Sequence, residues 1–163
     1  MKEYTVSAII PTLNRPNELE VALRSLIAQN RKPEEIIIID QSQSCETRNA
    51  LAAYIGTQDK PKVVYSHRPD FCSLVRAKKE GVLLAKGDII CFLEDDVVLD
   101  QSYIDAVVQG FKKNPSMMGC CGVMTNAVSK NHLEIMIFKL FHLGIFSDNR
   151  DEVFRRNYGE KLR

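Results

Sequence analysis

The sequence lacks the signatures of several common protein classes. Its five cysteines are an odd number without CxxC spacing, and its three histidines are scattered, so neither a disulfide framework nor a zinc site is indicated. It contains no GxGxxG turn and no GxxxxGK(S/T) loop, which are the phosphate-binding motifs of dehydrogenases and P-loop enzymes. A nucleotide would therefore have to be held through a metal ion and arginine side chains.

Long apolar runs and an imbalance of charge are also missing. No segment is long and apolar enough to cross a bilayer, and residues 1–4 lead into strand-like sequence without a secretory signal, so we expect a cytoplasmic protein. The 22 Lys and Arg residues against 21 Asp and Glu residues give a net charge of +1, which offers no general attraction for nucleic acid. With 163 residues, of which 45% are hydrophobic, the chain can bury the core of one domain.

Short apolar runs alternate with amphipathic segments over the first 125 residues. The runs that we expect to form strands are 6–10, 35–40, 62–66, 89–93 and 120–124. The segments that we expect to form helices are 19–30, 47–55, 73–86 and 101–113. This order predicts an α/β fold with an open, mostly parallel sheet flanked by helices on both faces.

An acidic triplet, Glu94, Asp95 and Asp96, directly follows the apolar run 89–93. Crowded carboxylates repel one another and lose hydration on burial, so such a cluster usually faces a divalent cation or a polyhydroxyl ligand. The alternative interpretation is that these acids only begin a loop or cap a helix.

Further residues suited to a ligand site follow the other predicted strands. They are Pro11, Thr12, Asn14 and Arg15 after the first strand, Asp40 at the end of the second, and Arg68 after the third. In open parallel sheets the carboxyl ends of the strands line the ligand crevice. We therefore expect these residues and the acidic triplet to open onto one edge of the sheet.

Three stretches of the chain together resemble a known family. Residues 7–16, 33–42 and 85–97 read SAIIPTLNRP, PEEIIIIDQS and AKGDIICFLEDDV, in this order. They are similar to the inverting family 2 glycosyltransferases, whose N-terminal half is a nucleotide-sugar-binding domain of the GT-A fold. The resemblance implies a Rossmann-like nucleotide-diphospho-sugar transferase core over residues 1–125. It also implies metal-dependent transfer of a sugar, with inversion, from a nucleotide-diphosphate donor to a hydroxyl acceptor such as a glycan or a lipid-linked sugar.

The resemblance assigns roles to the acidic residues. It implies that Asp96 holds Mn2+ or Mg2+ at the donor diphosphate, with Glu94 either as a second ligand or only orienting Asp96. Asp95 would face the ribose hydroxyls. Asp40 would accept a hydrogen bond from the nucleobase, and a UDP-sugar is the donor that we expect first.

The resemblance also defines the rest of the donor pocket. The donor-binding residues that it implies are Pro11, Thr12, Asn14, Arg15, Asp40, Asp95, Arg68 and Arg76. The last two, Arg68 and Arg76, are alternative partners for the diphosphate. The chain departs from the family at Gln41-Ser42, because a second acid and a glycine often follow the equivalent of Asp40.

Residues 126–163 contain a strongly apolar segment, 132–146, and a charged tail. We expect this segment to pack on the core, to begin a truncated acceptor-binding half, or to contact a membrane peripherally. Inverting transfer needs a general base, and no acid in this region lies in a motif that identifies one. A fragment without the base, or a non-catalytic nucleotide-sugar-binding module, is therefore the alternative to an active transferase. A nucleotidyltransferase is disfavoured because residues 11–16 contain no glycine.

Overall fold

The computed structural model describes residues 3–57, 61–123 and 125. The chain divides into two units, Met1–Gly122 and Val123–Arg163, and every element below lies in the first. The strands are β1 (Val6–Thr12), β2 (Glu35–Asp40), β3 (Lys62–His67) and β4 (Ile89–Phe92). The helices are α1 (Pro16–Ile27), α2 (Glu46–Ala50), α3 (Leu74–Leu84) and α4 (Tyr103–Lys113).

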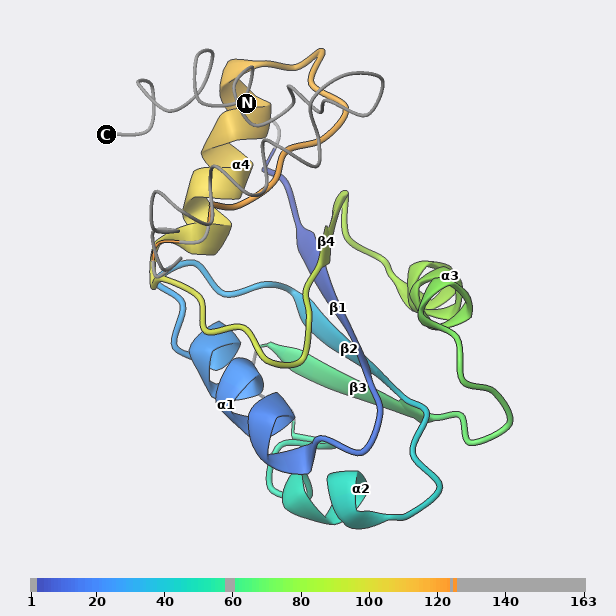
Figure 1. The fold of residues 1–163 in the computed structure, drawn as a ribbon. Coiled ribbons are helices and arrows are strands. Elements are labelled where there is room, and N and C mark those ends of the chain that lie inside the picture. Colours follow the sequence, from blue (N-terminus) through green and yellow to red (C-terminus); the bar gives the residue numbers. More distant parts are fainter. Residues whose placement is uncertain (1–2, 58–60, 124, 126–163) are drawn as a thin grey trace, which may run out of the picture. The chain divides into compact units, whose positions relative to one another are not determined.

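The four strands form one parallel sheet in the order β3-β2-β1-β4 (Figure 1). Thr12 lies opposite Asp40, and Asp40 lies opposite His67, so the carboxyl ends of β1, β2 and β3 are level. The chain adds strands on one side of β1 and then returns to place β4 on the other side. The strand order therefore reverses at β1, and in such sheets this is where a ligand crevice opens.

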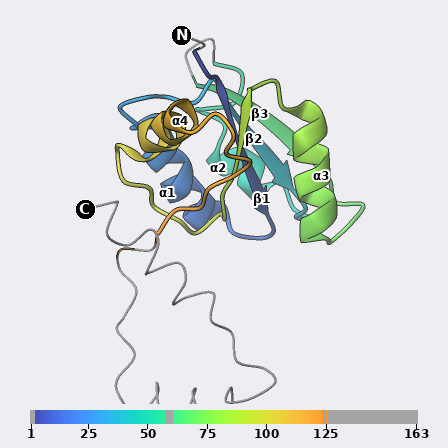
Figure 2. The same ribbon diagram turned by 90° about the horizontal axis from the view of Figure 1, so that it is seen from above.

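The helices cover both faces of the sheet, as the sequence predicts. Alternate side chains of a strand point to opposite faces, so Ala8 and Ile10 belong to the core with α1, α2 and α4, whereas Ile9 packs against Ala77 of α3. Figure 2 shows α1 and α4 on one side of the strands and α3 on the other. All six residues of β2 are buried, as the continuous apolar run predicts for a central strand.

Strand β1 extends two residues further than predicted, through Pro11 and Thr12. Proline usually ends a central strand because it cannot donate a ladder hydrogen bond. Here β4 pairs with β1 only as far as Ile9, which lies opposite Phe92, so the ladder on that side has already ended at Pro11. Pairing with β2 continues to Thr12 and carries that side chain to the crevice.

A buried carboxylate joins the opposite, amino-terminal ends of the strands. Glu35 Oε1 accepts hydrogen bonds from Ser7 Oγ at 2.7 Å and from the backbone nitrogen of Lys86 at 2.6 Å, and Ser7 Oγ accepts from the nitrogen of Gly87 at 2.8 Å. A Cβ at Gly87 would lie 2.6 Å from the Ser7 nitrogen, so only glycine allows this approach. We call these four residues the Glu35 cluster; it fixes the chain where β4 begins.

Two predicted elements differ from the structure. The predicted strand 120–124 is wrong for its described residues 120–123, which form no regular element and are exposed. Gly122 gives this run no side chain to pack, and short apolar runs are ambiguous from pattern alone. The predicted helix 47–55 is shorter in the structure, because α2 covers only Glu46–Ala50 and residues 51–56 form turns.

The helices of the described residues are all too short or too polar to span a bilayer. The apolar segment 132–146 lies outside the described residues.

Candidate functional site

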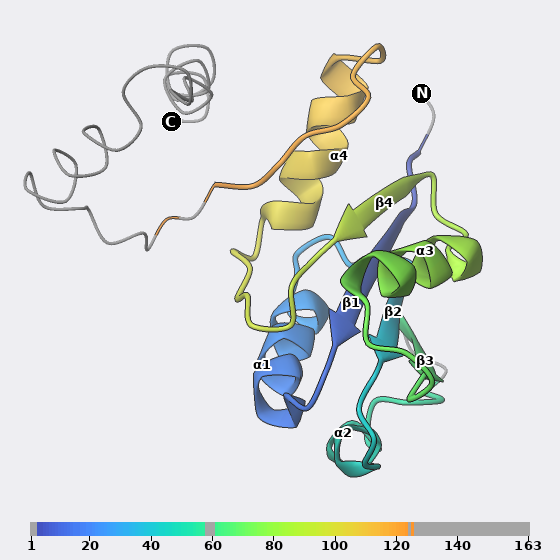
Figure 3. The same ribbon diagram turned by 45° about the vertical axis from the view of Figure 1, so that its right-hand side comes forward.

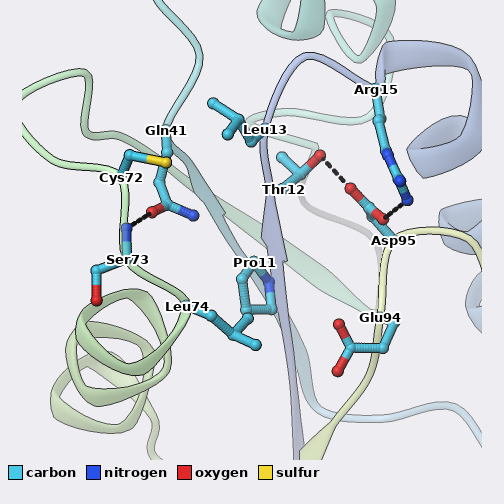
Figure 4. A pocket seen from close by; sticks show the side chains of 10 residues that line it. All are labelled: Pro11, Thr12, Leu13, Arg15, Gln41, Cys72, Ser73, Leu74, Glu94 and Asp95. Atoms are coloured by element: carbon cyan, nitrogen blue, oxygen red, sulfur yellow. Dashed lines mark hydrogen bonds and ion pairs between the residues drawn. The ribbon is translucent and has the colours of Figure 1, made fainter.

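A cavity of about 400 Å³ lies at the carboxyl ends of the strands, within the common size range of small-molecule sites (Figure 4). Its lining comes from the end of β1, from the loops after β1, β2 and β4, and from the residues that lead into α3. The lining residues are Pro11, Thr12, Leu13, Arg15, Gln41, Cys72, Ser73, Leu74, Glu94 and Asp95. Figure 3 shows β1 and β4, whose carboxyl ends meet at this cavity, side by side.

Thr12, Arg15 and Asp95 form a connected group on one side of the cavity. Thr12 Oγ1 donates to Asp95 Oδ2 at 2.8 Å, and Arg15 Nη1 donates to Asp95 Oδ1 at 3.2 Å. The same guanidinium nitrogen lies 3.1 Å from Asp96 Oδ2. Because Pro16 begins α1, Arg15 stands at the N-cap of that helix and faces the loop after β4. The acids of the triplet therefore have a cation from their own chain.

The electrostatics of this group follow from its different exposures. The Asp95 side chain is only 11% exposed and both of its oxygens are hydrogen-bonded, whereas that of Asp96 is 54% exposed. The charge of Asp95 and its hydrogen bond, followed by those of Asp96, raise the pKa of Arg15. Asp95 is thus held in place, and Asp96 is open to a ligand.

Glu94 points into the cavity from the same loop, and it also has a cation partner. Lys78 Nζ of α3 donates to Glu94 Oε1 at 3.2 Å and lies 5.7 Å from the ring centroid of Phe92. Lys78 of α3 therefore supplies a counter-charge to the triplet.

Asp40 is fully buried at the end of β2, with both carboxylate oxygens engaged. Oδ1 accepts from the backbone nitrogen of Ser42 at 2.9 Å, and Oδ2 accepts a short hydrogen bond from the Tyr65 hydroxyl. Burial, and then this hydrogen bond, raise the pKa of Tyr65. Asp40 is absent from the cavity lining and is 0% exposed, so a ligand in the cavity as it stands would not reach its carboxylate.

Asn14 shapes the loop after β1 instead of lining the cavity. Its φ of 55° lies in the left-handed region, which asparagine tolerates better than most residues. Its backbone nitrogen donates to Ser42 Oγ at 2.8 Å, which ties the loop after β1 to the loop after β2.

Arg68 and Arg76, the two predicted diphosphate partners, are paired with other acids outside the cavity lining. Arg68 Nε lies 2.7 Å from Glu80 of α3. Arg76 bonds Asp70 at 3.0 Å and lies over the ring of Phe71 at 4.1 Å. The structure thus brings Arg15, rather than either of these arginines, to the triplet.

Several residues that line the cavity were not predicted from the sequence to belong to the donor site. They are Leu13, Gln41, Cys72, Ser73 and Leu74. The rule that ligands bind beyond strand ends could have found Gln41, which directly follows Asp40. Ser73 is a helix-capping type of residue, and it caps α3 by accepting from the Arg76 nitrogen.

The acids at the cavity suit a hard divalent cation of the kind that keeps some water and phosphate ligands. The Asp96 side chain is exposed and accepts the hydrogen bond from Arg15 at Oδ2, so Oδ1 can serve as a ligand. In the part of the chain that the structure describes, no three Asp, Glu, His or Cys side chains form a metal cage. Asp96 could therefore hold Mg2+ or Mn2+ only together with other ligands such as a diphosphate, and Glu94, two residues earlier in the same loop, could be a second protein ligand.

Comparisons with solved structures show the fold. One neighbour is the mannosyltransferase PcManGT from Pyrobaculum calidifontis in complex with GDP-Man and Mn2+, with a TM-score of 0.61, 17% identity, and coverage of 68% of this chain and 33% of that one. Another is S. aureus TarS 1–349 in complex with UDP-GlcNAc, with a TM-score of 0.57, 18% identity, and coverage of 68% and 32%. The chain therefore has the α/β fold of GT-A glycosyltransferases, as predicted.

Sequence comparison identifies relatives of known name. The chain is 27% identical over 122 residues to validoxylamine A glucosyltransferase of Streptomyces hygroscopicus subsp. limoneus, covering 71% of this chain and 26% of the relative. It is 30% identical over 108 residues to the GalNAc(5)-diNAcBac-PP-undecaprenol beta-1,3-glucosyltransferase of Campylobacter jejuni subsp. jejuni, covering 64% and 33%. The chain spans about a quarter to a third of the length of these relatives.

The match to the family itself extends over nearly the whole chain. Residues 7–158 match the sequence profile described as Glycosyl transferase family 2. This range contains the cavity and all the acids described above. The chain therefore belongs to glycosyltransferase family 2.

Proposed function

We propose that this chain forms the donor site of a metal-dependent glycosyltransferase, which transfers a sugar with inversion from a nucleotide diphosphate to a hydroxyl acceptor. The observation that carries the proposal is the group of Thr12, Arg15 and Asp95 beside the exposed Asp96, at the strand-order reversal of a family 2 chain. The GDP-Man with Mn2+ and the UDP-GlcNAc in structural neighbours support a nucleotide-sugar donor. We propose a UDP-sugar as the donor.

Each residue has a part in holding the donor. Asp96, with Glu94 beside it, would hold Mn2+ or Mg2+, which when bound neutralises charge on the diphosphate. Asp95, fixed by Thr12, would accept hydrogen bonds from the ribose hydroxyls. Arg15 would pair with a phosphate oxygen once the metal neutralises the acids that it now contacts.

In the proposed reaction the acceptor hydroxyl oxygen attacks the anomeric carbon, and a base takes its proton. The bond from that carbon to the diphosphate oxygen breaks, and the nucleoside diphosphate leaves. The described residues bind and orient the donor, and we assign none of them as the base. We also propose that residues 126–163 begin an acceptor-binding half. The proposed acceptor is a glycan or a lipid-linked sugar, and the proposed location of the reaction is the cytoplasm.

A non-catalytic nucleotide-sugar-binding module is a second candidate. It is favoured by the two internal cations, because Arg15 and Lys78 already offset two of the three negative charges of the triplet. A module would bind the donor and show no transfer to any acceptor.

Calorimetric titration of the 163-residue chain with UDP, GDP and dTDP, with and without Mn2+, tests the donor site. We expect UDP to bind in the presence of Mn2+, and Asp96→Ala to weaken this binding at least about tenfold, because it removes the metal's main ligand. Asp105→Ala is the matched control, since Asp105 lies in the first turn of α4, outside the cavity lining. Failure of the folded wild-type chain to bind any of the three nucleotides would overturn the proposal.

A further inference from the structure

The side chain of Gln41 is held in one orientation at the cavity. Gln41 is 6% exposed, and its Oε1 accepts a hydrogen bond from the backbone nitrogen of Ser73 at 2.7 Å. A backbone N–H can only donate, so the amide atom that faces it must be the oxygen. The backbone nitrogen of Gln41 also donates to the Thr12 oxygen at 3.0 Å, which fixes the residue to β1. The amide nitrogen must therefore point away from Ser73.

That nitrogen faces the cavity without a hydrogen-bond partner. Figure 4 shows it directed toward the β1 residues, on the side opposite Ser73. Among the described residues, Oε1 is the only side-chain atom of Gln41 that forms a hydrogen bond. A nearly buried amide donor is stabilised when a ligand provides an acceptor. The cavity thus presents a fixed donor to whatever binds there.

The position of Gln41 indicates which part of a nucleotide it would meet. The acids and Arg15 are grouped at the β4 side of the cavity, where a metal ion and the diphosphate would lie. Gln41 lies on the other side of β1, with the apolar side chains of Leu13 and Leu74 also in the lining. Apolar walls with one fixed polar group suit a planar nucleobase.

The neighbouring carboxylate is not available for this contact. Both oxygens of Asp40 are engaged by Ser42 and Tyr65, and Asp40 is 0% exposed. At the end of β2, a nucleobase would therefore meet the N–H donor of Gln41 and no accessible carboxylate.

We propose that Gln41 determines nucleobase specificity, by donating a hydrogen bond from its fixed amide nitrogen to the carbonyl oxygen at position 4 of a pyrimidine base. This inference rests on the proposed donor function. Uracil and thymine have a carbonyl at position 4, where cytosine has an amino group that can only donate. The site therefore favours uridine and thymidine diphosphates and rejects cytidine diphosphate, which would place one donor against another.

Titration of the full chain with UDP and CDP in the presence of Mn2+ tests this assignment, because the two bases differ only at position 4 and in whether the adjacent ring nitrogen, N3, carries a hydrogen. We expect wild type to bind UDP about tenfold or more tightly than CDP. Gln41→Glu replaces the donor with an acceptor of the same shape and keeps the bond to Ser73. At about pH 8, where a carboxyl group is ordinarily ionised, this variant should bind CDP as tightly as UDP or more tightly. Gln43→Glu is the matched control, because Gln43 is exposed and outside the lining, and it should keep the wild-type preference.

The outcomes separate the two proposals. Equal binding of UDP and CDP by wild type would overturn the role of Gln41 and leave the donor site standing, and this comparison does not depend on the folding of any variant. An unchanged preference in a folded Gln41→Glu protein would have the same meaning. Absence of binding by all nucleotides to wild type would instead overturn the donor site, and with it this inference.

Discussion

The hydrogen bond from Tyr65 to Asp40 should be a measurable part of the stability of the fold. Tyr65→Phe removes the hydroxyl that bonds Oδ2 of a carboxylate with 0% exposure. Loss of a bond to a charged group costs about 1.5–3 kcal/mol. Tyr65 itself is only half-buried, so water can partly replace the hydroxyl. We therefore expect the free energy of unfolding to fall by about 1–2 kcal/mol.

Urea denaturation followed by circular dichroism measures this loss, which should appear as a lower midpoint with an unchanged slope. A second readout is pH. The raised pKa of Tyr65 means that the native state keeps its proton where the unfolded state loses it. The stability that depends on this protonation is present below about pH 10 and lost as the pH rises further. Tyr65→Phe should remove part of that alkaline loss.

Tyr54→Phe is the matched control for this experiment. The Tyr54 hydroxyl contacts Arg24 at 3.1 Å and Glu20 at 3.4 Å on the surface of α1, where water substitutes readily. Its removal should cost no more than about 0.5 kcal/mol. If Tyr65→Phe and Tyr54→Phe lose the same free energy, the argument that the buried carboxylate depends on Tyr65 is refuted.

Three further predictions concern packing and charge. Burial raises the pKa of the Cys91 thiol from about 9 to about 11, so the stability that depends on the protonated thiol is full below pH 9 and is lost as the pH rises to 11. Unfolding measured at a series of pH values should therefore show a smaller loss of stability between pH 9 and pH 11 for Cys91→Ala than for wild type. Gly81→Val should lower the free energy of unfolding by more than about 2 kcal/mol, because a Cβ there would overlap a buried isoleucine of β1, whereas Gly119→Val, with open space around it, should change little in the same urea titration. Arg15→Ala should bind free Mn2+ up to about fivefold more tightly than wild type in a calorimetric titration, because the guanidinium that contacts the acids is removed. Arg24→Ala, which removes an arginine paired with Glu20, should bind Mn2+ as wild type does. Equal Mn2+ affinities of Arg15→Ala and wild type would show that Arg15 does not compete with the metal ion.

Much of the fold follows from sequence pattern, because its strands carry the signals that burial imposes. The run 35–40 reads as a central strand and is β2 at the same bounds. Pattern fails where the outcome depends on neighbours. Pro11 argues against continuing β1, and only the early end of the β4 ladder explains why it is tolerated. The run 120–123 has strand-like composition and pairs with nothing among the described residues.

The sequence predicts which loops form the candidate site, but it does not predict most of the side-chain contacts within it. Strand ends placed Thr12, Arg15 and Asp95 at one crevice, and the structure joins them by hydrogen bonds. The partners of the arginines could not be predicted, because Arg68 reaches Glu80 only through the packing of α3 on β1 and β2. Asp40 likewise looks available in the sequence, and its use by Tyr65 depends on the register of β2 with β3.

The Glu35 cluster has a consequence for evolution of the site at the other end of the sheet. Strand β4 has only four residues and, within the described part of the chain, pairs with β1 alone, so few hydrogen bonds determine how far it is shifted along its neighbour. A shift by one residue would place Glu94 or Asp96, instead of Asp95, opposite Thr12. By fixing Gly87 against Ser7, the cluster selects which acid of the triplet is held rigid and which is left open to a ligand. We therefore expect substitutions at Glu35 to change nucleotide affinity at the proposed donor site without altering any residue that lines it.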